Sequence, residues 1–531
     1  MRFAFRCDAS LQIGSGHVMR CLTLARALRA AGHECHFICR DLPGHMAPQI
    51  KEAGFTISLL PAPEKGFVPG ADSPPHAVWA GVDWRLDARQ TQGAQKVHAE
   101  WLVLDHYAFD AKWQAATVPP GTRLLVIDDL ADRPHVANLL LDQNLGRAPA
   151  DYDGLLPPMA ERLVGPRYAL LRPEFLGQRP HSLQRRKSLG PKVQNLFIFL
   201  GGMDQHDVTS RALDAVDRAH LPDLAQITVV MGAAAPALAQ VRIRAQSMPV
   251  PTRVLTGVTD MAALMATADL AIGAAGGAAW ERCVLGLPTL LVVLADNQVD
   301  GANALQSMGC ARVVGPATAP DLAKDMAHAL SDLAANPKAC ADLSAHAARI
   351  ADGRGLARVV GALTTPITLR PANMGDGETV WHWRETLPET AFRTGRNAPL
   401  PDHLAWFGRA LTSPAHRLFM AETAAPVGHL RLDLGPEGAA TVSLLLDPAH
   451  RGAGLAPRLL ALIADHARQI GLKTLRAEVH QTNIPSLATF HAAGFSPEGE
   501  TDGFLNFRLD LRRLTSPAPV AHTPGKAPHA E

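Results

Sequence analysis

The sequence predicts an α/β protein in which two domains with doubly wound parallel sheets are followed by a smaller α+β domain. Strand-like and helical segments alternate over residues 1–362, glycine-rich turns follow strands in both halves of that region, and the order of elements changes near Ile367. At 531 residues the chain is also too long for one hydrophobic core. We therefore expect domains at residues 1–180, 190–362 and 366–514.

The first predicted domain opens with Phe3 and Phe5, which alternate into Asp8 before a glycine-rich turn and a helix over residues 18–31. Further strands are expected at Glu34–Cys39, Trp101–Leu104, Leu124–Ile127 and Leu139–Leu141. Polar residues follow three of these strands: Asp105-His106-Tyr107, Asp128-Asp129 and Asp142-Gln143-Asn144. Ligands of such sheets bind outside the carboxyl ends of the strands, so these are candidate cleft residues.

The second predicted domain repeats this pattern after residues 165–192, whose Arg, Pro, Gln and Ser content we interpret as an interdomain connection. A strand at Leu196–Leu200 leads to Gly201-Gly202, and Asp207 is an expected helix N-cap. Later strands are expected at Ile227–Met231, Leu270–Ile272 and Thr289–Leu294. Two similar halves predict a ligand cleft between them.

The third predicted domain has a different order of elements. A strand at Ile367–Arg370 and helices near Val380–Arg384 and His403–Leu411 precede strands at Leu418–Glu422, Gly428–Leu432 and Ala440–Leu446. The final residues, 515–531, are rich in Pro, Ala and His without a periodic apolar face, so we expect a disordered tail.

The composition excludes several classes of function. Lys and Arg total 51 and Asp and Glu total 50, so the net charge of +1 gives no field that would attract nucleic acid. The seven cysteines are scattered, which predicts no disulfide framework, and strand alternation separates Cys35 and Cys39 from His36, which argues against zinc. An apolar signal core and a run of about 20 apolar residues are both lacking. We therefore expect a cytoplasmic protein without a membrane partner.

Gly14 and Gly16 precede His17 in a turn between a strand and a helix. Backbone N–H groups at such a turn are free to bind an anion, and His17 can exchange a proton with the bound group near its unperturbed pKa of about 6.5. A solvated turn histidine is the alternative interpretation.

Gly201-Gly202 and Gly276-Gly277 follow strands of the second domain in the same way, so their backbone can approach a diphosphate closely. Glu281, on the following helix, can accept both hydroxyl groups of a ribose. An acidic residue there can equally complement the helix dipole.

Together these segments resemble the UDP-sugar hydrolase family of pseudaminic acid biosynthesis. The resemblance is collinear over residues 1–362 and rests on Asp8, Gly14-Ser15-Gly16-His17-Val18-Met19-Arg20, Gly201-Gly202-Met203-Asp204, Asp269-Leu270-Ala271-Ile272-Gly273, Gly276-Gly277, Trp280-Glu281-Arg282-Cys283, Gly286-Leu287-Pro288, Ala295-Asp296-Asn297-Gln298 and Asp352-Gly353-Arg354-Gly355. It implies two Rossmann-like domains in a GT-B-like arrangement. It also implies hydrolysis of UDP-2,4-diacetamido-2,4,6-trideoxy-β-L-altrose to UDP and the free sugar.

The same resemblance assigns His17 as the catalytic histidine and places Tyr107, Asn297 and Gln298 against the sugar and diphosphate, with the glycines and Glu281. UDP is a good leaving group, whereas water is a poor nucleophile at neutral pH, so a base is needed and histidine suits that role. Attack by a water opposite the diphosphate predicts inversion at the anomeric carbon. Because the sequence shows no acidic metal cluster, we expect metal-independent hydrolysis.

A second site is expected in the third domain. A strand ending at Asp447-Pro448 leads into a glycine turn, an amphipathic helix to about Ile470, and then Val479–Asn483, Ser486 and Gly494-Phe495. Residues 366–512 thereby resemble the GNAT acetyltransferases. The resemblance implies acetyl-CoA as co-substrate, with Asn483 at the pantetheine and the pyrophosphate on the backbone of the turn, formed by Arg451, Gly452, Ala453, Gly454, Leu455 and Ala456.

One position departs from that family. Phe490 stands seven residues after Asn483, where a tyrosine often serves as general acid, and a phenyl ring cannot donate a proton. Trp383-Arg384 and the segment His403–Phe407 further resemble the acetyltransferase that acts on the 4-amino group of the UDP-amino sugar before hydrolysis. A helix packing face explains His403 and Trp406 equally well.

Two alternatives remain open. The first two predicted domains can together form a GT-B glycosyltransferase that uses a UDP-sugar. The third predicted domain can be a GNAT-like binding module without activity.

Overall fold

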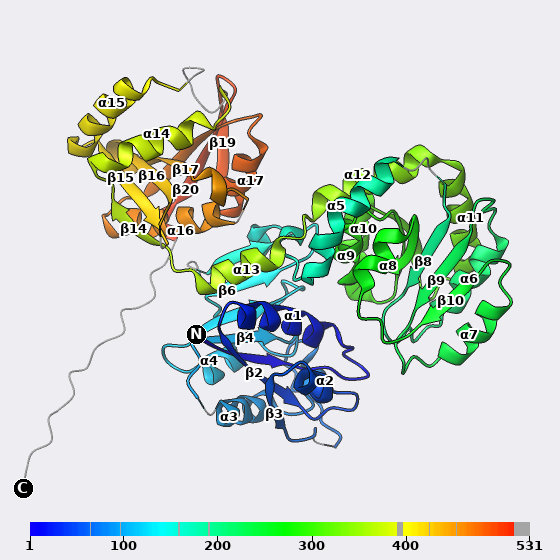
Figure 1. The fold of residues 1–531 in the computed structure, drawn as a ribbon. Helices are drawn as coiled ribbons and strands as arrows, with labels where there is room; N and C mark the ends of the chain where they lie inside the picture. The colour runs from blue at the N-terminus through cyan, green and yellow to red at the C-terminus, as the bar shows by residue number, and fades with distance from the viewer. Residues whose placement is uncertain are drawn as a thin grey trace, which may run out of the picture. The chain divides into compact units, whose positions relative to one another are not determined.

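The computed structural model contains three β-sheets with helices packed on them (Figure 1). It describes residues 1–63, 65–95, 97–157, 160–188, 192–389, 397–423, 425–452 and 454–513. The predicted tail at 515–531 and Ala453 of the predicted turn lie outside the described residues. Contacts divide the chain into two compact units, of which the first holds the first two sheets and the second begins at Ile367.

The first sheet is parallel throughout, in the order β3-β2-β1-β4-β5-β6-β7. Its inner strands β1, β4, β5 and β6 are mostly apolar and buried, as expected for a sheet with helices on both faces. The elements are β1 (Arg2–Cys7), α1 (Gly16–Ala30), β2 (Glu34–Arg40), α2 (Ala47–Glu52), β3 (Thr56–Leu60), α3 (Trp84–Ala94), β4 (Trp101–Asp105), α4 (Ala111–Thr117), β5 (Arg123–Ile127), β6 (Leu139–Asp142) and β7 (Glu161–Val164).

The second sheet is also parallel, in the order β10-β9-β8-β11-β12-β13. Its strands are β8 (Asn195–Phe199), β9 (Gln226–Val230), β10 (Thr252–Leu255), β11 (Leu270–Ala274), β12 (Thr289–Val293) and β13 (Arg312–Pro316). Its helices are α6 (Val208–Arg218), α7 (Leu238–Gln246), α8 (Met261–Thr267), α9 (Ala278–Val284), α10 (Val299–Ser307), α11 (Leu322–Ala335) and α12 (Pro337–Ile350). The predicted N-cap is confirmed, because the Asp207 carboxylate accepts a hydrogen bond from the Ser210 amide at 3.3 Å.

Helix α5 (Pro173–Ser188) occupies most of the segment that we interpreted as an interdomain connection; it does lie between the two sheets in the chain, but its helical structure was not predicted. Phe175 and Ser182 are fully buried. Arg179 donates from Nη2 to the carbonyl of Ala348 at 2.7 Å. Helix α5 thus packs on the second sheet, against α8, α9 and α12. Its many charged residues are the reason that the sequence pattern did not predict a helix.

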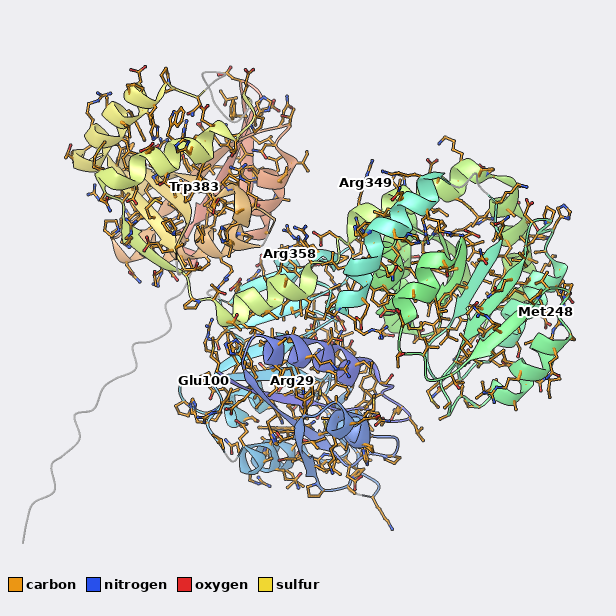
Figure 2. The ribbon with its side chains drawn as sticks, in the orientation of Figure 1. Arg29, Glu100, Met248, Arg349, Arg358 and Trp383 are labelled. Carbon is orange, nitrogen blue, oxygen red and sulfur yellow. The ribbon has the colours of Figure 1, made fainter. Side chains whose placement is uncertain are left out.

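Helix α13 (Gly355–Thr364) lies inside the predicted range 190–362 but contributes to the core of the first sheet, where Val359 and Leu363 are buried beside α1. Trp101 of β4 donates from Nε1 to the carbonyl of Leu363 at 3.1 Å. Arg358, labelled in Figure 2, donates to the carbonyl of Arg167 at 2.7 Å. The last helix of the first unit, α13, therefore packs against the first sheet and α1, at the other end of the unit's sequence.

The second unit is a mixed sheet in the order β14-β15-β16-β17-β18-β20-β19. The elements are β14 (Thr368–Pro371), α14 (Gly377–Glu385), α15 (Leu400–Thr412), β15 (His416–Glu422), β16 (Pro426–Leu434), β17 (Ala439–Leu446), α16 (Leu455–Gln469), β18 (Thr474–His480), α17 (Ile484–Ala492), β19 (Ser496–Thr501) and β20 (Phe504–Asp510). Helices α14 and α15 pack on one face of the sheet, and α16 packs on the other. No helix among the described residues is long and apolar enough to cross a bilayer.

Buried ion pairs fix the first sheet. Asp87 of α3 accepts from Arg6 at 2.7 Å and from Arg40 at 2.6 Å, and none of these three side chains is exposed. Asp8 accepts from Arg6 at 2.8 Å and pairs with His106 at 3.2 Å. Charges removed from water require such partners, so Asp8 of the predicted motif serves the scaffold.

Replacing Asp87 tests this network. Asp87→Asn leaves two buried guanidinium groups without their shared carboxylate, so we expect a loss of about 3–5 kcal/mol in the free energy of unfolding of the first unit, measured by urea denaturation. The matched control, Asp332→Asn, breaks an exposed pair with Arg312 and should cost at most about 1 kcal/mol. Equal losses in the two variants would contradict a scaffold role.

Candidate functional site

The carboxyl ends of β1 and β4 lie side by side. The chain leaves β1 to build β2 and β3 on one side and returns to add β4 on the other, so the two following loops open at the same point of the sheet edge. The loop after β1 passes through Gly14, at φ 79°, into α1, which begins with Gly16 and His17. Strand β4 ends at Asp105. The second sheet repeats this arrangement at β8 and β11.

The imidazole of His17 is held by Asp105. Nδ1 of His17 lies 2.5 Å from Oδ1 of Asp105, and only 9% of the His17 side chain is exposed. With Nδ1 donating its proton to the carboxylate, Nε2 is left as the basic nitrogen. No residue in the described part of the chain forms a hydrogen bond with Nε2. The arrangement therefore offers a proton acceptor at Nε2.

Arg20 joins Asp105 to a second carboxylate, Asp129. Its Nε and Nη2 donate to the two oxygens of Asp105 at 2.6 and 2.7 Å, and its Nη1 donates to Asp129 at 2.6 Å. Burial by itself would raise the pKa of Asp105, but the charge of Arg20 and the hydrogen bonds from Arg20 and His17 hold that pKa well below its usual value. The carboxylate that orients His17 thus stays ionised at neutral pH.

Tyr107 lies beside His17, as predicted for a residue of the same site. The two rings are perpendicular with centroids 4.7 Å apart, and the Tyr107 hydroxyl donates to Asp129 at 2.5 Å. Burial and the Asp129 charge raise the pKa of Tyr107, so the phenol stays neutral. Trp79 stacks on Tyr107 at 5.6 Å, and His76 lies edge-on to Trp79 at 4.7 Å. These rings form an aromatic wall next to the imidazole.

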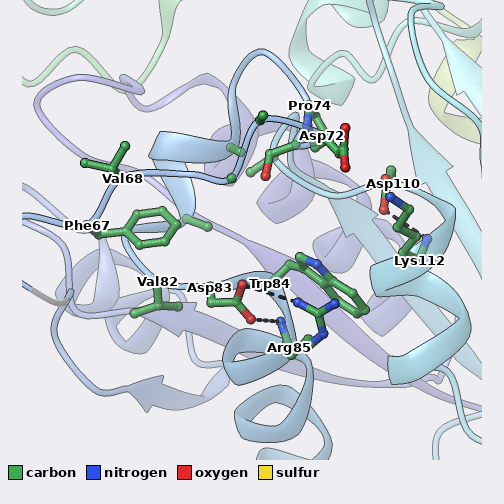
Figure 3. A pocket seen from close by; sticks show the side chains of 16 residues that line it. Phe67, Val68, Asp72, Pro74, Val82, Asp83, Trp84, Arg85, Asp110 and Lys112 are labelled. Atoms are coloured by element: carbon green, nitrogen blue, oxygen red, sulfur yellow. Dashed lines mark hydrogen bonds and ion pairs between the residues drawn. The ribbon is translucent and has the colours of Figure 1, made fainter.

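A hollow of about 310 Å³ is lined by chain neighbours of this aromatic wall (Figure 3). Residues between Phe67 and Arg85 form most of its lining, with Ala108, Asp110 and Lys112. None of the predicted site residues lines it, so we do not assign it to the His17 site.

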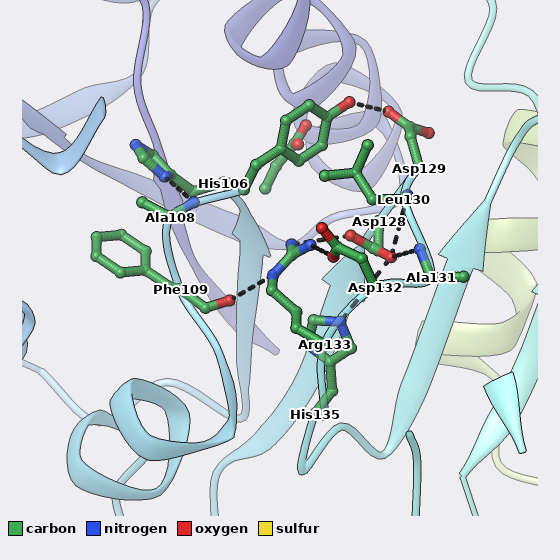
Figure 4. A network of polar contacts seen from close by, with 12 residues as sticks. His106, Ala108, Phe109, Asp128, Asp129, Leu130, Ala131, Asp132, Arg133 and His135 are labelled. Atoms are coloured by element: carbon green, nitrogen blue, oxygen red, sulfur yellow. Dashed lines mark hydrogen bonds and ion pairs between the residues drawn. The ribbon is translucent and has the colours of Figure 1, made fainter. Parts of the chain in front are cut away.

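A second carboxylate network lies at the ends of β5 and β6, and Figure 4 shows the part that contains Asp128 and Arg133. Arg133 pairs with Asp128 at 2.8 Å, and the Tyr152 hydroxyl lies within hydrogen-bond distance of Asp128 at 3.1 Å and of Asp142 at 3.0 Å. Burial and the charge of Asp129 raise the pKa of Asp142 to about 7. One carboxyl of this network therefore keeps its proton well above the usual range of aspartate.

The glycine turns of the second sheet lie at the carboxyl ends of β8 and β11. Gly201 has φ 88°, a conformation that favours glycine, and the Gly202 carbonyl accepts from Gly232 at 2.9 Å. Gly277 is exposed and directly precedes α9. A side chain on Gly276 would lie 3.6 Å from Nε2 of Gln298, so the structure brings these two predicted residues together.

Glu281 of α9 is mostly buried, with 18% of its side chain exposed, and lies 3.6 Å from Nη2 of Arg172. Burial raises the pKa of Glu281, an effect that Arg172 partly opposes. The sequence analysis did not identify Arg172. Asn297 is exposed in a short 3-10 turn (Asp296–Gln298), and no contact in the described residues joins its side chain to the other predicted residues.

Strands β17 and β18 of the second unit diverge. They pair in parallel only between Ala439–Thr441 and Thr474–Arg476, although both strands continue beyond these residues. At the far end of β17, Gly452 and Gly454 have φ values of 76° and 81°. Helix α16 begins at Leu455, directly after Gly454, and Ala456 is half-buried in its first turn. An extended ligand can thus bind backbone groups that the sheet leaves unpaired.

The side chains around this opening have defined partners. Arg451 donates to the hydroxyl of Thr386 at 2.7 Å and to the carbonyl of Trp383 at 3.2 Å, so its guanidinium is held within the domain. Asn483 caps α17 by accepting from the Ser486 amide at 3.2 Å. Phe490 is buried and packs on Phe495 with ring centroids 5.1 Å apart.

His403 and Trp406 lie on the side of α15 that packs on the sheet. His403 is buried, with Nε2 3.1 Å from the carbonyl of Gly377 in α14. The Trp406 ring packs on the cluster shared by α14, α15 and the sheet, with the Arg431 guanidinium 5.2 Å from its centre. These contacts favour the packing interpretation.

Sequence reasoning missed several residues that complete the first site. The sequence marks Asp105 and Asp129 only as candidate cleft residues at strand ends, and Arg20 only as part of a motif. The signal that could have identified Arg20 is its spacing, since residues three apart in a helix share a face with His17. No group of three His, Cys, Asp or Glu side chains arranged to hold a metal occurs among the described residues.

The fold and sites define a GT-B-type unit joined to a GNAT domain. Residues 195–354 match the family described as Glycosyltransferase family 28 C-terminal domain, and residues 379–495 match the Acetyltransferase (GNAT) family. The crystal structure of MurG from Acinetobacter baumannii superposes with a TM-score of 0.51 and 16% identity, covering 68% of this chain and 98% of MurG. The predicted fold class is confirmed.

Two curated relatives are similar to part of the chain. The UDP-2,4-diacetamido-2,4,6-trideoxy-beta-L-altropyranose hydrolase of Campylobacter jejuni is 27% identical over 205 residues, 38% of this chain and 61% of the relative. The spore coat polysaccharide biosynthesis protein SpsG of Bacillus subtilis is 28% identical over 202 residues, 38% of this chain and 57% of that protein. The matches thus span about three fifths of each relative. With the GNAT match, they confirm the predicted resemblance to a hydrolase-like unit fused to a GNAT domain.

The raised pKa of Asp142 predicts an unusual dependence of stability on pH. Between about pH 4 and 7 the folded state binds a proton at Asp142 that the unfolded state has released, so this group lowers stability as the pH rises. Asp142→Asn keeps acceptors for Tyr152 and removes the titration. Its stability relative to the wild type, from urea denaturation at pH 5 and 8, should increase with pH by at most about 1.4 kcal/mol per pH unit. Parallel curves for the two proteins would contradict the assignment.

Proposed function

We propose that the first unit hydrolyses UDP-2,4-diacetamido-2,4,6-trideoxy-β-L-altrose to UDP and the free sugar. The observation that carries this proposal is the buried pair of His17 and Asp105, with Nε2 free at the point where the strand order reverses. The similarity to the hydrolase of C. jejuni supports the choice of substrate.

In this mechanism His17 acts as general base. A water donates a proton to Nε2 while its oxygen attacks the anomeric carbon, and the bond from that carbon to the diphosphate oxygen breaks with its electron pair leaving on UDP. The imidazolium formed is stabilised by the ionised Asp105. Attack from the side opposite UDP inverts the anomeric centre. Tyr107 and the neighbouring aromatic wall hold the sugar.

The second sheet holds the nucleotide in this proposal. Backbone N–H groups of Gly201-Gly202 and Gly276-Gly277 bind the diphosphate, Glu281 accepts the ribose hydroxyls, and Asn297 and Gln298 complete the diphosphate site. Gln205, three residues after Gly202, donates to the carbonyl of Leu11 at 3.2 Å, which supports one substrate reaching both sets of residues.

We further propose that the second unit transfers an acetyl group from acetyl-CoA to the 4-amino group of the precursor UDP-amino sugar. The divergence of β17 from β18 and the two positive-φ glycines fit a pantetheine and its pyrophosphate. The backbone from Arg451 to Ala456 would bind the pyrophosphate. The Asn483 amide nitrogen would donate to the pantetheine, because its oxygen caps α17. Acetyl-CoA supplies the activated acetyl group.

Two other functions have specific support. The fold shared with MurG favours a glycosyltransferase, which would require an acceptor other than water. Incubation with the UDP-sugar and water alone separates the two, since only a hydrolase gives free sugar and UDP. The core position of Phe490 favours a binding module without activity, for which acetyl-CoA would bind without turnover.

His17→Ala should lower the rate of UDP release by about 10²–10⁴-fold, because the general base is lost. Asp105→Asn should lower kcat as well, since the amide cannot stabilise the imidazolium. Both rates are followed by NMR, together with acetylation of the UDP-4-amino sugar, which should be unchanged. The control is His36→Ala. His36 lies on β2, and its ring forms hydrogen bonds with Thr56 and Ser58 of β3. Loss of acetylation in His17→Ala would refute separate active centres.

Asn483→Ser tests the proposed acetyl-CoA site. Serine caps a helix about as well as asparagine, so α17 should stay intact, while the shorter side chain cannot reach the pantetheine. We expect the KM for acetyl-CoA to rise about tenfold, as for a lost hydrogen bond of about 1.4 kcal/mol, with little change in Tm. An unchanged KM would exclude Asn483 from the site.

A further inference from the structure

Arg282 is a buried cation at the end of β11. Its side chain comes from α9, and only 2% of the residue is exposed. One nitrogen, Nη2, donates to the carbonyl of Ala274 at 2.5 Å, whereas Nε and Nη1 have no hydrogen-bond partner among the described residues. The part of the chain that the structure describes places no carboxylate within ion-pair distance of it.

The backbone next to Arg282 is shaped to admit the guanidinium. A Cβ on Gly273 would meet Nη1 of Arg282 at 2.5 Å, so glycine at this position of β11 leaves the space that the side chain fills. Ala274, which accepts the hydrogen bond, is followed directly by Ala275 and the Gly276-Gly277 turn. The positive charge therefore lies at the base of the proposed diphosphate turn.

A buried charge without a counter-ion is costly, and natural proteins rarely keep one unless a ligand compensates it. Burial lowers the pKa of Arg282 to about 10, which leaves the group protonated at neutral pH. Glu281, its chain neighbour, lies instead 3.6 Å from Arg172. Glu281 therefore compensates Arg282 only at a distance and forms no ion pair with it, so an anion bound at the turn would meet a cation that is only partly compensated.

We propose that Arg282 is a positioning residue that stabilises the diphosphate of the nucleotide, and the charge that develops on it as UDP leaves, through the low-dielectric interior behind Gly276-Gly277. This inference rests on the proposed UDP site of the second sheet. The guanidinium acts through the backbone turn and is not in contact with the substrate. Its field favours the diphosphate, and most of all the extra negative charge that UDP gains as it leaves, over an uncharged nucleoside, because an electrostatic interaction is strong where water is excluded.

The test compares binding of UDP and of uridine to the full chain by calorimetry, since uridine keeps the base and ribose but lacks the diphosphate. In Arg282→Met we expect the Kd for UDP to rise at least tenfold while the Kd for uridine changes less than twofold, and Arg282→Lys should recover part of the difference. Arg186→Met is the matched control, because Arg186 is another largely buried arginine that donates to backbone carbonyls of the same domain, among them that of Ala268 at 3.0 Å.

A purely structural role for Arg282 predicts equal losses for both ligands, or none, and either result would overturn the inference. Gly273→Ala provides a second variant, since the added methyl group displaces the guanidinium without removing its charge. It should weaken UDP binding selectively in the wild type and have no further effect in Arg282→Met. If Arg282→Met does not fold, the comparison of UDP and uridine binding in Gly273→Ala tests the inference by itself. Failure of the wild type to bind UDP would instead refute the proposed function.

Discussion

The first unit depends on two neighbouring strand ends. Because β1 and β4 are adjacent at the point where the strand order reverses, a histidine in the first turn of α1 meets a carboxylate at the end of β4. The parallel sheet places the ends of β1 and β4 side by side, and the loop through Gly14, at φ 79°, leads into α1 so that His17 lies 2.5 Å from Asp105. Arg20 adds a third point of attachment from the same helix.

The buried carboxyl groups around this site are each neutralised. Asp8 and Asp87 are neutralised by arginines beneath the sheet, Asp105 is neutralised by Arg20, and Asp142 keeps a proton instead. Each solution avoids an uncompensated charge in the interior. Arg282 in the second sheet departs from this rule, which is why we assign its compensation to the nucleotide.

The proposed acetyl-CoA site of the second unit depends on another geometry. Where β17 and β18 separate, backbone groups lose their partners in the sheet, and a glycine turn with a helix behind it faces the same end of β17. Phe490 occupies the core with Phe495 and Phe507, so any proton for a departing thiolate must come from another group. The two proposed reactions therefore differ in their proton transfers: the hydrolase needs a base for water, and the acetyltransferase needs a proton donor for the thiolate.

The sequence by itself determined the three sheets, most strand positions and the glycine turns, because strand alternation and turn residues are local signals, and it singled out His17 as a candidate. It also determined the role of Asp207 as a cap. It failed for α5, whose polar residues hide an apolar stripe, and for α13, which lies far along the chain from the core that it completes. Only the tertiary structure decided that Asp105 orients His17, that Arg172 lies against Glu281 and that Arg282 is buried without a counter-ion, because strand order and side-chain burial arise from contacts between segments distant in sequence.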